Sequence, residues 1–206
     1  LSKEKQNTSS FNYTGFTALK IDKSLHKYGT IDTLLKQSIE QLYTKNIKDK
    51  FVGQLIVTPD CISDFLGFIT SDISDGRMIS GTSLYKNKLD KQITNSKLTF
   101  HSRPVSDEIT DGYFVTSDGY VAENSTIVDK GVLKTYLLGV YGSKKLGKNR
   151  AVNDGGAYIV DPGDKSYSSI IKSIDKGVLL ARFSGGTPAN NGDFSGVAKN
   201  SYYIEK

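Results

Sequence analysis

The chain has 206 residues, 24% of them charged and 37% hydrophobic, which excludes an intrinsically disordered protein and indicates a soluble globular one. No apolar run approaches the roughly 20 residues that a membrane-spanning helix needs. The net charge of +5 comes from lysines interspersed with acidic residues along the chain, which favours a solvated surface and argues against nucleic acid as a partner.

The first third of the chain predicts alternating strands and helices. Aromatic residues alternating with small ones indicate a strand, and apolar residues at helical spacing indicate a helix with one buried stripe. Thr58 followed by Pro59 is a typical helix start. The predicted elements are a polar linker at 1–10, a strand at 11–19, a helix at 31–47, a strand at 51–57 and a helix at 58–73 that stops at Asp75–Gly76.

The rest of the chain predicts mostly antiparallel strands with one longer helix, because short apolar runs are separated by Asp-Gly and Lys-Gly turns. The fold class is therefore α+β, with an N-terminal α/β region at 1–76 and a β-rich domain at 77–206. The predicted elements are a strand at 98–105, hairpins at 113–122 and 125–138, helical turns at 141–146, a strand at 157–160, a helix at 164–174 and strands at 177–183 and 193–204.

The last two strands enclose a polar loop that we expect to be functional. Gly185 and Gly186 follow the strand at 177–183, and paired glycines there permit positive φ and close backbone approach. Exposed strand edges beside such a loop can accept an extended peptide by β-augmentation. The tyrosines that end the chain suit an interface, since Tyr combines apolar area with a polar tip.

The residues that could hold zinc or act as a nucleophile are few. Only His26, His101 and Cys61 offer nitrogen or sulfur ligands, and they lack helical ligand spacing, so we expect no metal site and no other cofactor. Cys61, in the first turn of a predicted helix, and a serine remain open as nucleophiles of a stand-alone hydrolase. Ser195 does not lie in a G-x-S-x-G elbow.

Four segments of this sequence resemble the TldD/PmbA family, also called modulator of DNA gyrase. The likeness is strong over the last 80 or so residues and weak before residue 51. The segments are GVLKTYLLGVYGSKKLG (131–147), NDGG (153–156), GVLLARFSGG (177–186) and NGDFSGVAKNSYYIE (191–205).

The resemblance implies one half of a cytoplasmic, bacterial, heterodimeric zinc peptidase that takes an extended peptide. In that family the TldD-type subunit carries zinc on an HExxxH helix plus a later Cys, whereas the TldE/PmbA-type subunit lacks these ligands. The comparable helix here, residues 60–73, has no His and no Glu. The resemblance therefore implies the non-metal TldE/PmbA-like subunit, inactive alone, with a TldD-like partner and no catalytic residue of its own.

The resemblance also suggests which residues line the peptide cleft, although a plain turn requirement remains an alternative for each of them. The family is about twice this length, so we expect a chain truncated at both ends, or a degenerate relative. Homodimerisation in isolation and a DNA- or gyrase-binding role remain alternatives. The cleft candidates are Gly185, Gly186, Asp193, Ser195, Asn153, Gly155 and Gly156.

Overall fold

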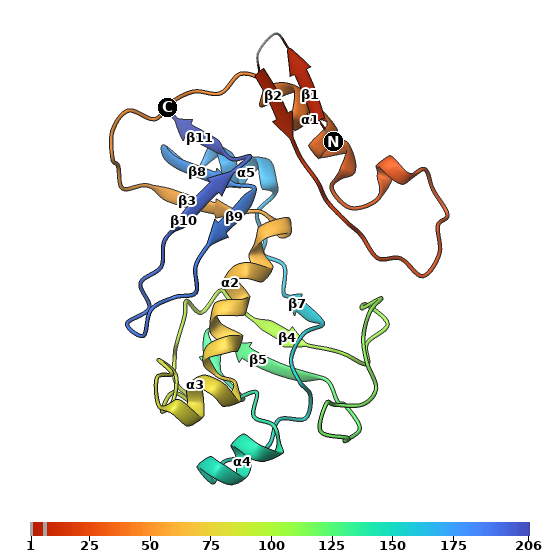
Figure 1. The fold of residues 1–206 in the computed structure, drawn as a ribbon, viewed down its shortest axis with the longest axis vertical. Coiled ribbons are helices and arrows are strands. Elements are labelled where there is room, and N and C mark those ends of the chain that lie inside the picture. The colour runs from red at the N-terminus through yellow and green to blue at the C-terminus, as the bar shows by residue number, and fades with distance from the viewer. Residues whose placement is uncertain (1, 6–7) are drawn as a thin grey trace. The chain divides into compact units, whose positions relative to one another are not determined.

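The computed structural model describes residues 2–5 and 8–206, with side chains from residue 9 onward. Helices and strands are short and mixed along the chain, which confirms the α+β class (Figure 1). The elements are β1 (Ser2–Lys5), β2 (Thr8–Phe11), the 3₁₀ turn η1 (Leu25–Lys27), α1 (Ile31–Glu40), β3 (Gln54–Val57), α2 (Pro59–Asp72), α3 (Asp75–Ser80), β4 (Phe100–Ser102), β5 (Ser125–Asp129), β6 (Val132–Leu133), α4 (Val140–Leu146), β7 (Tyr158–Val160), α5 (Tyr167–Lys172), β8 (Lys176–Leu180), β9 (Arg182–Gly185), β10 (Gly196–Lys199) and β11 (Tyr202–Glu205).

Residue contacts divide the chain into two compact units that interleave along the sequence, and each is described by itself. The predicted division at residue 76 stays a prediction. Among the described residues, no helix has the length and apolar character needed to cross a membrane. Unit 1 comprises Leu1–Ser63, Lys165–Gly185 and Gly196–Lys206; unit 2 comprises Asp64–Asp164 and Gly186–Ser195.

Unit 1 is built on a three-stranded sheet with β8 in the centre, parallel to β3 and antiparallel to β11 (Figure 1). Leu179 and Leu180 of β8 are buried, as is Leu34 of α1. Two hairpins, β1–β2 and β9–β10, complete the unit. Its core is small, because each strand contributes only four or five residues.

Unit 2 is built on an antiparallel four-stranded sheet of order β6-β5-β4-β7. The ladder between β4 and β5 shifts register at Phe100 and His101, which marks a β-bulge. The largest fully buried side chains of the molecule gather in this unit. They are Phe100, Ile73, Met78, Ile127, Leu133, Leu138 and Val128.

Three predictions for the first 50 residues are corrected. The linker predicted at 1–10 contains the β1–β2 hairpin, and residues 1, 6 and 7 lie outside the described residues. Only Phe11 of the strand predicted at 11–19 is in a strand, because the buried Asn12 is held by side-chain bonds to Ser38 and Gln41, each at 2.9 Å. The helix predicted at 31–47 ends at residue 40, before a stretch rich in weak helix formers.

The helix at Pro59 begins as predicted, directly after Thr58. The Thr58 carbonyl accepts the first helical hydrogen bonds, whereas the Thr58 hydroxyl donates to the carbonyl of Ala181 at 3.2 Å. α2 stops at Asp72, shortly before the predicted stop at Asp75–Gly76, and a short helix that was not predicted, α3, starts at Asp75 and is capped by Gly81, whose φ is +79°.

The two predicted hairpins of unit 2 are only partly formed. The pair at 113–122 is reduced to one bridge between Val115 and Val121. The strand predicted at 132–138 is regular only over β6, because its later residues bond elsewhere; the N–H of Leu137 donates to the carbonyl of Ile73 at 3.0 Å.

The two last predicted strands are each divided in two. The first becomes β8 and β9, and the second becomes β10 and β11. The division falls at Ala181, whose N–H donates to the Ser201 hydroxyl at 3.2 Å and not to a ladder carbonyl. Each predicted strand therefore contributes one part, β8 or β11, to the three-stranded sheet and the other part, β9 or β10, to a hairpin.

Candidate functional site

Three of the predicted cleft residues lie in one loop of unit 2, residues Gly186–Ser195. The loop closes where the N–H of Gly186 donates to the carbonyl of Ser195 at 3.3 Å. Inside it, the Asn191 amide donates to the Asp193 carboxylate at 2.7 Å and accepts from the Asp193 N–H at 3.1 Å. The loop is therefore an ordered turn, which leaves Asp193 and Ser195 exposed.

Gly185 belongs to unit 1, where it pairs with Gly196 across the β9–β10 ladder. Among the described residues the left-handed glycines include Gly192, with φ +89°, but not Gly185 or Gly186. Neither paired glycine adopts the positive φ that a glycine permits, and the ladder keeps the first of them extended. The glycine that does need this conformation stands in the loop.

A second set of predicted residues forms a separate turn in unit 2. Asn153 is 2% exposed; its amide donates to the Glu123 carbonyl at 2.7 Å and to the Ser125 hydroxyl at 2.9 Å. Its side-chain oxygen accepts from the N–H of Gly155 at 3.0 Å. Gly155 and Gly156 have φ of +77° and +72°, so both positions favour glycine.

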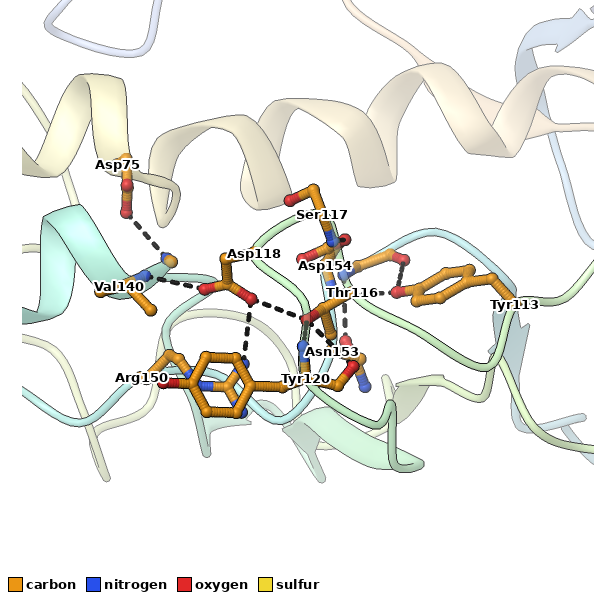
Figure 2. A network of polar contacts seen from close by, with 12 residues as sticks. Asp75, Tyr113, Thr116, Ser117, Asp118, Tyr120, Val140, Arg150, Asn153 and Asp154 are labelled. Carbon is orange, nitrogen blue, oxygen red and sulfur yellow. Dashed lines mark hydrogen bonds and ion pairs between the residues drawn. The ribbon is translucent and has the colours of Figure 1, made fainter.

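A tyrosine that the sequence analysis missed closes this turn. The Tyr113 hydroxyl donates to the Gly155 carbonyl at 2.7 Å and accepts from the Asp154 N–H at 2.8 Å, as Figure 2 shows. Burial raises the pKa of the Tyr113 phenol above its usual value. The Asp154 carboxylate in turn accepts from the N–H of Ser117 at 2.5 Å. The NDGG segment is thus held from both sides.

Asp118 is the centre of the polar network in Figure 2. Its carboxylate accepts from the Thr116 hydroxyl at 2.6 Å and from the Val140 N–H at 2.9 Å, and lies 3.5 Å from the Arg150 guanidinium. These contacts, with the Thr116 hydrogen bond first, hold the pKa of Asp118 below its usual value. Arg150 also stacks on the Tyr120 ring, with its guanidinium carbon 3.9 Å from the ring centroid.

The start of α4 is held by a second carboxylate. Asp75 accepts from the N–H groups of Gly139 and Gly142, each at 3.1 Å. A Cβ on Gly142 would lie only 2.0 Å from this carboxylate, so the contact requires glycine. The carboxylates of Asp75 and Asp118 both accept hydrogen bonds from backbone N–H groups, and we assign them a structural role.

A histidine links two strands of the unit 2 sheet and the residue that follows a third, β7. His101 of β4 lies with Nδ1 2.8 Å from the Thr126 hydroxyl and Nε2 3.1 Å from the Asp161 carboxylate. The ring is buried, whereas Asp161 is exposed. The spatial order of hydroxyl, imidazole and carboxylate resembles that of a nucleophile, its base and an orienting acid. Thr126, however, lies within the paired strand β5 and directly opposite His101. The arrangement therefore supports a bridge between strands.

The residues of α2 do not fit a zinc site of the HExxxH kind. The helix contains no His and no Glu. Its cysteine, Cys61, is fully buried, which removes the access that a nucleophile or a catalytic metal ligand needs. Among the described residues, no group of three or more His, Cys, Asp or Glu side chains is arranged to hold a metal ion.

The loop at 186–195 is attached to the helices of unit 2 at two points. The Arg77 guanidinium donates to the Pro188 carbonyl at 2.9 Å and to the Asn190 side chain at 3.1 Å. The Phe194 ring packs against Phe68 of α2, with ring centroids 5.4 Å apart. No periodic pattern in the sequence links these residues, which explains why the sequence analysis missed Arg77.

Unit 1 has an open groove of about 870 Å³ beside β11. Tyr202, Tyr203 and Phe51 contribute to its wall, and the Tyr202 hydroxyl donates to the Glu40 carboxylate at 2.7 Å. None of the predicted cleft residues lines it. The peptide-cleft role of those seven residues stays a prediction.

A comparison with known protein families gives a match over most of this chain. Residues 52–206 match the family described as PmbA/TldA metallopeptidase C-terminal domain. A relative from Buchnera aphidicola subsp. Baizongia pistaciae, named Metalloprotease PmbA homolog, is 23% identical over 164 residues, which are 78% of this chain and 36% of the relative.

Solved structures share the fold. A Bacteroides thetaiotaomicron protein described as a modulator of DNA gyrase superposes with a TM-score of 0.71 at 23% identity, covering 87% of this chain and 43% of that one. TldE from Thermococcus kodakarensis gives a TM-score of 0.69 at 17% identity, covering 85% and 44%. The chain thus spans less than half the length of each of these proteins.

Proposed function

Because this chain belongs to the PmbA/TldA metallopeptidase family, we propose that it is a TldE/PmbA-like, non-catalytic subunit of a heterodimeric zinc peptidase. In this role it binds and guides an extended peptide, while a TldD-like partner in the cytoplasm supplies the zinc and the activated water. The chain corresponds to the C-terminal part of its relatives' length by family match, so the activity of the whole assembly is part of the proposal.

The observation that carries the proposal is the composition and burial of α2. A metal-bearing helix needs imidazole or carboxylate side chains that converge on one exposed point. In α2 the buried face holds Cys61 and Leu66, and the Asp72 carboxylate is engaged by the N–H of Leu84 at 2.5 Å. These residues stabilise a helix but leave it without a ligand set.

The loop at 186–195 is the part of the chain best suited to guide a peptide. It is ordered by its own hydrogen bonds, yet Asp193 and Ser195 remain exposed. Asp193 can pair with a peptide amine or a basic side chain, and Ser195 can accept or donate a hydrogen bond. Gly186 keeps the neighbouring backbone accessible, since a Cβ there would meet no atom within 4 Å.

The proposal is tested by mixing the purified chain with a TldD-type zinc subunit and measuring the native mass and the cleavage of an unstructured peptide. We expect a heterodimer, cleavage that a chelator abolishes, and no cleavage by this chain alone. A homodimer that ignores the zinc subunit would contradict the proposal. So would chelator-resistant cleavage by the isolated chain, which would favour the stand-alone hydrolase.

A further inference from the structure

We propose that Arg77 is the positioning residue of the loop at 186–195. The loop geometry stands by itself, and its consequence for peptide binding rests on the proposed function. The loop contains Asp193 and Ser195 but lies more than 100 residues after Arg77 in the sequence. Its position therefore depends on a long-range contact.

The guanidinium contacts the loop through two different donors. Nη2 donates to the Pro188 carbonyl at 2.9 Å, and Nη1 donates to the Asn190 side-chain oxygen at 3.1 Å. Two parallel donors on a rigid planar group fix both the distance and the orientation of the segment they bind. An ammonium group in the same place would be a single point charge and would lack this fork.

Asp72 holds the guanidinium in place from the other side. Its carboxylate lies 3.6 Å from Arg77 Nε, and its side chain is only 8% exposed. The same carboxylate accepts from the N–H of Leu84 at 2.5 Å, so it is fixed to the backbone before it meets the arginine. A largely buried carboxylate of this kind orients a cation more strongly than an exposed one.

The far end of the loop is attached by an aromatic contact and not by charge. Phe194 lies 5.4 Å from Phe68 and 5.9 Å from Phe65, measured between ring centroids. The stretch between Asn190 and Phe194 is therefore held at both ends, and Asp193 stands within it. Removing the arginine frees one end and leaves the other attached.

The test compares Arg77→Ala and Arg77→Lys with Arg103→Ala. Arg103 is a matched control, because it lies in the same unit and its guanidinium has no hydrogen-bond or ion-pair partner among the described residues. In the isolated chain we expect amide exchange of residues 189–193 to accelerate about tenfold in Arg77→Ala, because two hydrogen bonds to the loop are lost and a factor of ten corresponds to about 1.4 kcal/mol, and to accelerate less in Arg77→Lys. Exchange in β4 and β5 should be unchanged.

In the complex with the zinc subunit we expect Arg77→Ala to raise KM about tenfold with kcat nearly unchanged, because peptide positioning is lost while the chemistry belongs to the partner. Added ethylguanidinium should restore the loop protection and the KM of Arg77→Ala, but not of a chain that is merely unfolded. The Arg103→Ala chain should behave as wild type.

Three outcomes separate the two proposals. Unchanged loop exchange in Arg77→Ala, or exchange accelerated equally throughout unit 2, would overturn the role of Arg77. Faster loop exchange with an unaltered KM would overturn its consequence for peptide binding. A wild-type complex that neither forms nor cleaves would defeat the proposed function, while selective, guanidinium-rescued loop exchange would still support Arg77 as the positioning residue.

Discussion

The two units of this chain are stabilised in different ways. Unit 1 depends on short β-ladders around β8, and many of its apolar side chains are exposed, Val52 and Leu19 most of all. Unit 2 has the larger core, and side chains such as Asn153 and Asp118 bond to the backbone of its irregular segments. β-ladders form the centre of the first unit, whereas side-chain hydrogen bonds hold the irregular segments that make up much of the second.

The difference matters for the site, because irregular backbone is where binding residues are usually displayed. A buried turn without ladder partners must satisfy its N–H and carbonyl groups through side chains. The turn at Gly155 does this with Asn153 and Tyr113. The irregular segments of unit 2 therefore depend on side chains that bond to their backbone. Removing these side chains one at a time tests the difference between the two units.

The largest effect is expected for Asn153→Ala. The change removes two donated bonds and one accepted bond, and leaves the Glu123 carbonyl and the Gly155 N–H without their partner in a buried turn. We expect the free energy of unfolding to fall by about 3 kcal/mol, as measured by urea denaturation. The exposed Asn87→Ala is the control, with a change within about 0.5 kcal/mol. Equal effects at the two positions, which both lie in unit 2, would mean that the side-chain bonds of Asn153 do not stabilise this unit.

A smaller effect is expected in unit 1 for Gly177→Ala. An added Cβ would lie 2.2 Å from the Gln54 carbonyl oxygen, so β3 and β8 must move apart. We expect a loss of about 2 kcal/mol, with amide exchange accelerated in β3, β8 and β11 and unchanged in β4 and β5. Gly163→Ala, which meets no atom within 4 Å, should be nearly neutral. Faster exchange throughout the chain would mean that the units do not unfold separately.

Regular elements with a strong local signal were predictable from the sequence. Pro59 after Thr58 located the start of α2, and the apolar residues before Gly185 located β8. The helix predicted at 164–174 is present as the shorter α5, which is capped by Ser166, whose hydroxyl accepts from the Ser169 N–H at 3.3 Å. These features depend on neighbours within a few residues, which a sequence displays directly.

The contacts that organise the loops were not predictable in the same way. Arg77 meets Pro188, and Tyr113 meets Gly155, across separations that no periodic pattern encodes. Strand lengths were overestimated for a related reason, since Ala181 bonds to a serine side chain where the apolar run alone predicts a continued ladder. Local pattern pointed to the loop that follows Gly185 and Gly186, whereas the full set of seven cleft candidates depended on family resemblance.

The pH dependence of the stability of Asp118→Asn tests whether a charged side chain stabilises unit 2. The pKa of Asp118 is lowered in the fold, chiefly by the Thr116 hydroxyl and then by the Val140 N–H and Arg150. A lowered pKa contributes stability that is complete above the unfolded pKa of about 3.9 and is lost as pH falls through the lower folded value. We expect the variant to have a lower urea midpoint than wild type at pH 6. This difference in midpoint should disappear as the pH falls from the unfolded pKa of about 3.9 through the lower folded value.

The control for the Asp118→Asn prediction is the same urea measurement at high ionic strength. Its carboxylate is held by hydrogen bonds to a hydroxyl and a backbone N–H, so the gap between wild type and variant should persist at high ionic strength. A gap that stays constant from pH 6 down to strongly acidic conditions would show that the charge of Asp118 does not contribute, and that the network is held by shape alone.

The smallest effect is expected for Glu205→Gln in unit 1, because the Lys176–Glu205 pair is solvent-exposed, with N and O 3.2 Å apart. The hydrogen bond from Lys176 lowers the pKa of Glu205, so its contribution is complete above the unfolded value of about 4.3 and is lost as pH falls through the folded one. We expect a slightly lower urea midpoint at pH 6 that disappears in acid and, unlike the Asp118 gap, also in about 0.5 M NaCl. A gap that resists salt would mean that unit 1 uses a shielded charge pair, and the distinction between the two units would then lie in core size alone.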